Sequence, residues 1–437
     1  DDRSFYVATN ERDPRFFDLY EIAADGYEKT LLYQDETGYQ IADVSPDERY
    51  LAFNKPRTTF DSDIYVYDRQ TEEMRHLTPH EGHVAHSALQ FTKDGTGLYA
   101  TTDEGHEYAY LVRYDLASGE RHEVLKPEWD VMYAYLSKHG KYLVAAINND
   151  AKTELRMFEA ATMEPVPVPD LPQADITSVS LSRDESLMTF YASSDRRPPD
   201  LYVYDLAQGG EPRRLTDSLS PEVDPENLVD AEVVRFASYD GVQVPGVLFK
   251  PHQAGPEAKA PAVIYIHGGP GGQTRVGYNP LVQYLVNHGY VVYGINNRGS
   301  SGYGKTFFKM DDKKHGEADL DDVVASKKML IDTGYGSKLS EKQLRNFQAE
   351  PGDPLHWTGI AQNWNTTCAD CHSTNLHKNY DPVTDTYHTT FEEIDVSCEE
   401  CHGPGSLHVE LANSNSLFWD RRHGKGLVKL KSEQLKW

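Results

Sequence analysis

The fold of the middle of this chain is decided by residues 262–272, Ala262-Val263-Ile264-Tyr265-Ile266-His267-Gly268-Gly269-Pro270-Gly271-Gly272. The first five residues form an almost continuous apolar run, which predicts a strand buried on both faces of a sheet. The six residues that follow are nearly all glycine or proline, so they predict a tight loop with exposed backbone N–H groups. A buried strand that ends in such a loop is typical of a layered α/β domain.

The flanking residues predict the rest of that layer. Residues 233–236 and 245–249 surround a turn at Asp240-Gly241, which predicts a β-hairpin. Residues 281–288 have helical spacing and end at Gly289, residues 290–295 form a second buried strand, and residues 319–332 form an amphipathic helix. Alternating strands and helices predict a parallel sheet with right-handed crossovers.

The front of the chain repeats itself over residues 1–220. Apolar runs begin at Leu19, Ile64, Leu111, Leu155 and Leu201, which lie 45, 47, 44 and 46 residues apart. A second pattern of turns, such as Ser45-Pro46-Asp47 and Ser182-Arg183-Asp184, recurs at the same period. This period is the length of a four-stranded propeller blade. The repeat predicts about five blades rather than a β-sandwich, and we expect Phe5–Thr9 to be an inner strand.

Charge and hydropathy limit the partners. The 437 residues carry a formal net charge of −26, which repels phosphate backbones, so we expect no nucleic-acid partner. No apolar run is long enough to predict a membrane span. All four cysteines lie in the last fifth of the chain, and the front therefore uses no disulfide.

Two glycine-rich loops and the upstream propeller carry a family resemblance. His267-Gly268-Gly269-Pro270 follows one buried strand, and Asn297-Arg298-Gly299-Ser300-Ser301-Gly302-Tyr303-Gly304 follows the next. With the propeller, these loops resemble serine peptidases of the prolyl oligopeptidase family, of the acylaminoacyl-peptidase or dipeptidyl-peptidase type, over residues 1–335. The resemblance implies peptide substrates and places His267, Gly268 and Gly269 in or beside an oxyanion hole.

The nucleophile of that family is missing from the sequence. Family members continue into a G-x-S-x-G turn that presents the catalytic serine, followed by Asp and His. No G-x-S-x-G occurs anywhere in these 437 residues, and the resemblance stops near Tyr335. We therefore assign no catalytic triad and expect no peptidase turnover from the chain as it stands, because an oxyanion hole contains no attacking group.

The last part of the chain predicts a different chemistry. Cys368-Ala369-Asp370-Cys371-His372 and Cys398-Glu399-Glu400-Cys401-His402 are both C-x-x-C-H. Two thiols in this spacing can add to the vinyl groups of one haem while the next histidine binds the iron. The two motifs predict two haem c groups, with His372 and His402 as proximal ligands.

Two other uses of these cysteines stay open. Zinc could bind two Cys pairs, although 26 residues separate Cys371 from Cys398, which is longer than the usual ribbon spacing. A redox-active dithiol is the other alternative, although the βαβ context of a thioredoxin-like motif is absent.

Residues 352–431 resemble multihaem cytochromes c of the type associated with tetratricopeptide repeats. The resemblance rests on Asp353–Trp357, Asn363–Asn365 and Cys398–Pro404. It implies His388 and His408 as candidate distal iron ligands and a redox partner protein. Because c-type haem attachment requires a dedicated maturation system, we expect a periplasmic or otherwise extracytoplasmic location, although no signal peptide is visible.

The sequence as a whole predicts four regions. They are a partial β-propeller (1–220), the N-terminal half of an α/β-hydrolase domain (221–335), a junction (336–351) and a small, loop-rich c-type haem segment (352–437). Three interpretations fit: a peptidase-family piece fused to a dihaem electron-transfer segment, a multihaem cytochrome with a non-catalytic propeller, or an artificial join of two unrelated fragments.

Overall fold

The structure is a computed structural model that describes residues 3–169, 171, 174–255, 257–268, 271–312, 314, 316–337, 377–381, 384 and 386–390. The chain divides into two units, Asp1–Lys338 and Leu339–Trp437. None of the helices in the described ranges is long and apolar enough to cross a bilayer.

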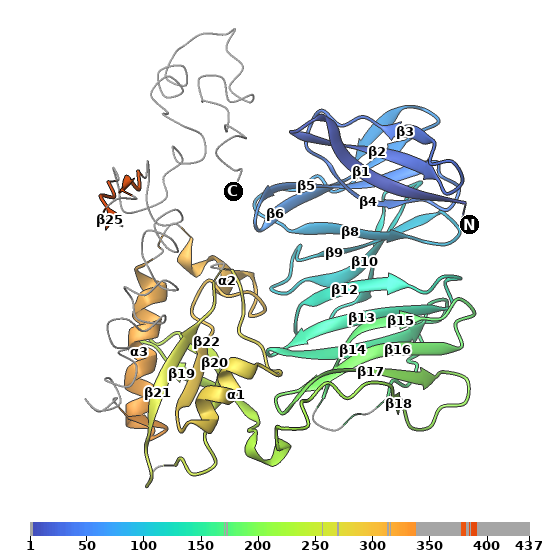
Figure 1. Cartoon of the computed structure of the whole chain (residues 1–437). Coiled ribbons are helices and arrows are strands. Elements are labelled where there is room, and N and C mark those ends of the chain that lie inside the picture. The colour runs from blue at the N-terminus through green and yellow to red at the C-terminus, as the bar shows by residue number, and fades with distance from the viewer. Residues whose placement is uncertain are drawn as a thin grey trace. The chain divides into compact units, whose positions relative to one another are not determined.

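The front of the first unit consists of five antiparallel sheets that follow one another in chain order (Figure 1). Their strands are β1 (Ser4–Asp13), β2 (Phe16–Ala23) and β3 (Lys29–Tyr33); β4 (Gln40–Val44), β5 (Tyr50–Thr58), β6 (Asp61–Asp68) and β7 (Glu73–His76); β8 (His86–Phe91), β9 (Gly97–Thr102), β10 (Tyr110–Asp115) and β11 (Arg121–Leu125); β12 (Val131–Leu136), β13 (Tyr142–Asn149) and β14 (Lys152–Glu159); and β15 (Asp175–Leu181), β16 (Leu187–Ser194), β17 (Arg197–Asp205) and β18 (Arg213–Arg214).

In the three middle sheets, the apolar residues alternate between two cores along the strands, and this alternation is typical of propeller blades. On β13, Tyr142 and Val144 pack toward the fifth sheet, whereas Leu143, Ala145 and Ile147 pack toward the third. The three middle sheets thus bury both faces against their neighbours, unlike the sheets of a sandwich, in which one face meets water. The expected five blades are confirmed.

Two details of the blades differ from the prediction. The repeat aligns β1 with the second strands β5, β9, β13 and β16, so Phe5–Thr9 is not the innermost strand. The fourth sheet has three strands instead of four, because the segment after β14 carries Pro165 and Pro167. Prolines lack the N–H that a ladder needs, and the fourth strand is reduced to a single bridge between Phe158 and Pro165.

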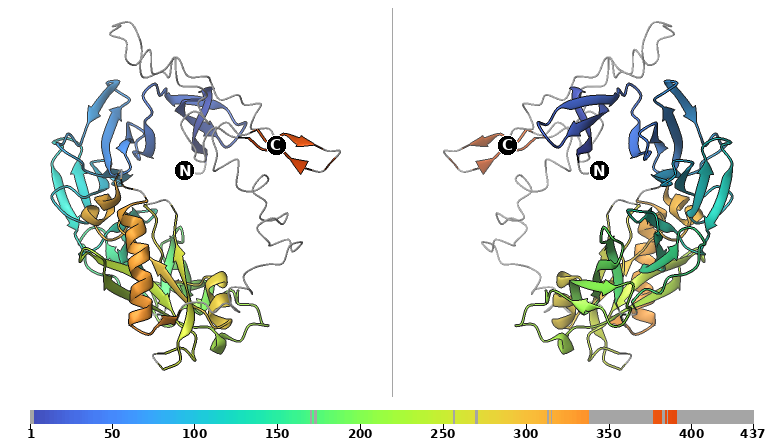
Figure 2. Two further views of the ribbon diagram at one scale, coloured as in Figure 1. Left: turned by 90° about the vertical axis from the view of Figure 1, so that its left-hand side faces the viewer. Right: turned by 90° about the vertical axis from the view of Figure 1, so that its right-hand side faces the viewer.

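The rest of the first unit is a five-stranded sheet with helices on both faces (Figure 2). Its elements are η1 (Pro225–Asn227), β19 (Ala231–Ala237), β20 (Gln243–Phe249), β21 (Ala260–Ile266), α1 (Pro280–Asn287), β22 (Val291–Ile295), α2 (Lys305–Phe308), η2 (Lys309–Asp311), α3 (Ala318–Asp332) and β23 (Gly336–Ser337). The strand order is β19-β20-β22-β21-β23, with β21 parallel to both β22 and β23.

Alternation along β22 explains why both faces are covered. Val291, Tyr293 and Ile295 pack into the core that α3 closes through Leu330, whereas Val292 packs into the core that α1 closes. The predicted hairpin, both buried strands and both helices are therefore confirmed. β23 lies in the segment expected to be a junction, and it extends the sheet by pairing with Ala260 and Pro261.

The second unit is described only around a short hairpin, β24 (Tyr380–Asp381) and β25 (Thr386–Tyr387). An isolated bridge joins His377 to Thr390 beside it.

Candidate functional site

The candidate site lies where β21 and β22 end. The carboxyl ends of parallel strands share one edge of a sheet, and open α/β sheets bind their ligands there. The glycine loop, residues 267–272, leaves β21 at this edge, and the serine loop, residues 296–304, leaves β22. Gly269 and Pro270 lie outside the described residues.

A hydrogen bond between two side chains joins the loops. The Nε2 of His267 lies 2.9 Å from the Oγ of Ser300. That Oγ donates to the Asn297 carbonyl at 2.6 Å, so it accepts from His267. His267 is the residue predicted beside the oxyanion hole, and its ring ties the two loops together.

Backbone contacts reinforce this joint. The Ser301 N–H donates to the Gly272 carbonyl at 3.0 Å. Gly272 must be glycine, since a Cβ there would lie 2.4 Å from the Gly268 carbonyl oxygen. Behind it, Asn296 accepts from the Thr274 N–H at 2.6 Å and donates to the Thr274 carbonyl at 2.9 Å. The two loops therefore form one rigid corner.

Arg298 anchors the serine loop to the domain core. Its guanidinium, whose side chain is 6% exposed, contacts Asp322 on α3 and Asp240 in the β19–β20 turn, each at 2.8 Å. Both carboxylates raise the pKa of Arg298 above its ordinary value, and Arg298 lowers the pKa of Asp240 to about 2. The Ser238 hydroxyl donates to Asp322 at 2.6 Å, so the fully buried carboxylate has several partners.

Gly268 in the glycine loop offers a backbone donor. Gly268 is exposed, and its N–H makes no hydrogen bond to any residue in the described ranges. A Cβ placed on Gly268 would meet nothing within 4 Å, so the space in front of it is open. An exposed N–H beside open space can donate a hydrogen bond to a carbonyl oxygen, as the oxyanion prediction requires.

Ser300 is not a nucleophile, although it pairs with a histidine. Its residue is 0% exposed, and its proton points to the Asn297 carbonyl instead of the histidine. An attacking serine would need to reach a substrate and to pass its proton to the base. The dyad-like pair therefore has a structural role.

The propeller contacts this corner directly. Asn148 of β13 donates to Gln273 at 2.8 Å, and Arg275 donates to Thr153 of β14 at 2.9 Å. At the other end of the serine loop, the Glu107 carboxylate accepts from the Thr306 N–H at 2.6 Å. The blades thus hold both loops in place.

Sequence reasoning missed several of these residues. Asp240 and Asp322 lie in a turn and on a helix whose patterns predict only local structure, and their shared contact with Arg298 spans 58 and 24 residues. The one available signal was Asp322, an acidic residue on the buried face of α3, because a buried carboxylate is rarely left unpaired.

Most predicted haem residues lie outside the described residues, namely Cys368, Cys371, His372, Cys398, Cys401, His402 and His408. His388 is described: it is exposed, and its backbone N–H donates to the Asn379 carbonyl at 3.3 Å. The assignment of these eight residues to iron or haem stays a prediction.

Comparison with known families agrees with the two units. Residues 27–215 match the N-terminal β-propeller domain of prolyl oligopeptidase, and residues 277–339 match the prolyl oligopeptidase family. Residues 341–403 match the family of cytochrome c554 and c-prime. The last two matches meet within two residues of the boundary between the units.

Curated relatives of this chain are named as peptidases, and solved structures share its fold. Dipeptidyl aminopeptidase BIII of Pseudoxanthomonas mexicana is 26% identical over 339 residues, which cover 75% of this chain and 49% of the relative. The uncharacterized peptidase YuxL of Bacillus subtilis (strain 168) is 36% identical over 34% of this chain and 22% of its own length. A prolyl endopeptidase structure superposes with a TM-score of 0.63 at 21% identity, covering 77% of this chain and 51% of that structure. At its greatest, the match spans about half the length of these relatives.

Proposed function

Because residues 27–215 and 277–339 belong to the prolyl oligopeptidase family, we propose that the first unit binds peptides at the glycine loop without hydrolysing them. One observation carries the binding proposal: the exposed Gly268 N–H at the carboxyl edge of the sheet, which has no hydrogen-bond partner among the residues that the structure describes. The relatives that match this part of the chain are named as peptidases, which favours a peptide carbonyl as the acceptor to which this N–H donates.

Two features of the printed sequence and its fold support the proposed lack of turnover. The chain has no G-x-S-x-G turn, and the serine nearest to a histidine in the site, Ser300, is buried. Without an attacking group, donors to a carbonyl can bind a peptide but cannot cleave it.

Fluorescence anisotropy of a labelled oligopeptide tests this proposal on the full chain. We expect saturable binding and no cleavage products. Gly268→Ala keeps the backbone N–H, has room for its methyl group and should fold normally. Because the methyl group would occupy the open space through which a peptide carbonyl approaches that N–H, binding should weaken roughly five- to tenfold, the value of about one hydrogen bond. Equal affinity of parent and variant, or no binding at all, would contradict the role of Gly268.

We propose a second function for the tail, the attachment of two c-type haems for electron transfer. The donor chemistry supports it: two C-x-x-C-H motifs use all four cysteines, and the cytochrome c554 and c-prime match includes both motifs. Cys368, Cys371, Cys398 and Cys401 would form the thioethers, and His372 and His402 would bind iron. Covalent haem attachment would in turn favour an extracytoplasmic location.

The absorption spectrum of the reduced protein, matured in a host competent for c-type haem, tests this assignment. A sharp α-band is expected. A colourless protein that binds zinc would instead support a zinc site at the two cysteine pairs.

A further inference from the structure

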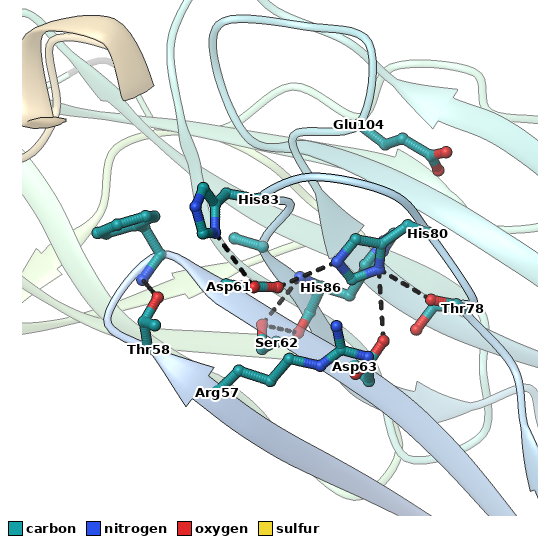
Figure 3. A network of polar contacts seen from close by, with 12 residues as sticks. Arg57, Thr58, Asp61, Ser62, Asp63, Thr78, His80, His83, His86 and Glu104 are labelled. Carbon is teal, nitrogen blue, oxygen red and sulfur yellow. Dashed lines mark hydrogen bonds and ion pairs between the residues drawn. The ribbon is translucent and has the colours of Figure 1, made fainter.

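A cluster of histidines and carboxylates lies at the turn between β5 and β6 (Figure 3). Asp61 accepts from His80 at 3.0 Å and from His83 at 3.2 Å. Asp63 lies 2.8 Å from His76 and 2.5 Å from Arg57. Neither site discussed above uses these residues.

His80 is built to carry a positive charge. Its Nε2 faces Asp61, and its Nδ1 lies 3.0 Å from the Thr78 carbonyl and 3.3 Å from Asp63. All three partners only accept hydrogen bonds, whereas a neutral imidazole has a single N–H to donate. Burial of the side chain, 2% exposed, opposes the charge, but these acceptors outweigh burial and raise the pKa of His80.

His86 packs beside His80 and stays neutral. The ring centroids are 5.1 Å apart, and His86 is 2% exposed, with no partner for either ring nitrogen among the described residues. Burial, together with the charge of His80, lowers the pKa of His86 to about 4. One charged and one neutral histidine therefore share this interior.

The cluster does not match a metal site. Both nitrogens of His80 are occupied by hydrogen bonds, and in the described part of the chain no three His, Cys, Asp or Glu side chains are grouped to hold a metal ion. Its chemistry is proton binding.

Phe60 connects the cluster to the hydrolase domain. Its ring lies 5.2 Å from the ring of His83 and 6.4 Å from that of Phe308, between centroids, and Lys309 Nζ lies 4.6 Å from its centroid. Phe308 in turn covers Gly271 of the glycine loop, where a Cβ would lie 2.6 Å from the ring. A chain of contacts therefore runs from Asp61 to the glycine loop.

We propose that the His80–Asp61 pair is a protonation-controlled latch between the propeller and the hydrolase domain. With His80 protonated, Asp61 and His83 are held in place, and the turn presents Phe60 to Phe308 and Lys309. When His80 loses its proton, one of its contacts with an acceptor is lost, and the turn releases the α2–η2 segment, residues 305–311. This regulation goes beyond the proposed peptide binding and does not depend on it.

The direction of the pH dependence follows from the raised pKa of His80. The contribution of protonated His80 to stability is complete below the ordinary histidine pKa of about 6.5. It is lost as pH rises through the higher pKa that His80 has in the folded protein. The other charged or titratable groups near the pair or in the α2–η2 segment include Asp63, Arg57, His76, His83, His86, Glu104, Arg121, Asp103, Glu107, Lys305, Lys309 and Asp311. The carboxylates ordinarily titrate below this window and the lysines and arginines above it.

Hydrogen–deuterium exchange on the full chain tests the latch without any ligand. Protection factors for residues 304–311, corrected for intrinsic rates, should fall about tenfold between about pH 6 and about pH 9, as the loss of one hydrogen bond to a charged group would give. In His80→Gln, protection should no longer vary across this range. His122→Gln, an exposed histidine on β11, should behave like the parent.

Asp61→Asn keeps an acceptor but removes the charge, so it should move the parent transition to lower pH, and it keeps the test open if His80→Gln does not fold. Protection that is independent of pH in the parent, or an unshifted transition in either His80→Gln or Asp61→Asn, would overturn the proposal.

Discussion

The Nε2 of His267 lies 2.9 Å from the Oγ of Ser300, the geometry of a catalytic dyad, yet the serine is fully buried and donates its proton to Asn297. The pair joins the glycine loop to the serine loop. A contact that elsewhere activates a nucleophile thus serves here to shape a binding corner.

Ser300→Ala should destabilise this corner measurably. The variant leaves the Asn297 carbonyl and the His267 N–H without their partner, and a buried unsatisfied group costs about 1–3 kcal/mol. Ser301→Ala is the matched control: its backbone N–H still bonds Gly272, so it should cost less than about 1 kcal/mol. Denaturant unfolding monitored at the hydrolase domain measures both, and equal costs would contradict the structural role of Ser300.

The two glycines of the glycine loop should respond differently to alanine. Gly268→Ala meets open space, whereas Gly272→Ala would press on the Gly268 carbonyl. We expect a loss of about 1–3 kcal/mol for Gly272→Ala, as for other overpacked sites, and almost none for Gly268→Ala. The same unfolding measurement compares the stability of the two variants. A Gly272→Ala variant as stable as the parent would contradict the close approach of Gly272 to the Gly268 carbonyl.

Substitution of Arg298 should cost far more stability than substitution of its exposed partner, Asp240. Arg298→Met leaves the fully buried Asp322 without its cation, which typically costs about 3–5 kcal/mol. Asp240→Asn acts at a side chain that is 36% exposed, so it should cost no more than about 1 kcal/mol. If the two variants lost similar stability in thermal melts, the contact between Arg298 and Asp322 would not be the one that stabilises the serine loop.

His86 should make the propeller sensitive to acid. Its folded pKa, about 4, lies below the ordinary value, so stability is lost as pH falls from about 6.5 toward 4, by roughly 3 kcal/mol in total. His86→Leu loses no hydrogen bond and should flatten this part of the stability profile. Unfolding midpoints across that pH range test it, and a variant as acid-sensitive as the parent would contradict the assignment.

Each haem should be lost with its own cysteine pair. Changing Cys368 and Cys371 to Ala should remove one haem, and changing Cys398 and Cys401 to Ala should remove the other, because each motif supplies both thioethers. Quantitative haem absorbance per polypeptide measures this. Loss of both haems from either variant would show that the motifs do not act separately.

The sequence predicted the elements but not the contacts that assemble them. The repeat after Leu19 and the run at residues 262–266 determine local structure, because burial imposes a readable period on each strand. The Arg298–Asp322 clamp and the His80 cluster join segments whose separate patterns are unremarkable. Pro165 and Pro167 are unfavourable in a strand, so the loss of the fourth strand from the fourth blade could have been predicted from the sequence.

One mass measurement tests the central account most directly. The full chain, matured in a host competent for c-type haem, is incubated with a fluorophosphonate that labels active serine hydrolases, and its intact mass is recorded. The account predicts a single polypeptide that carries two haems and no phosphonate. A phosphonate adduct on a serine of residues 221–337, or a polypeptide without haem, would contradict it.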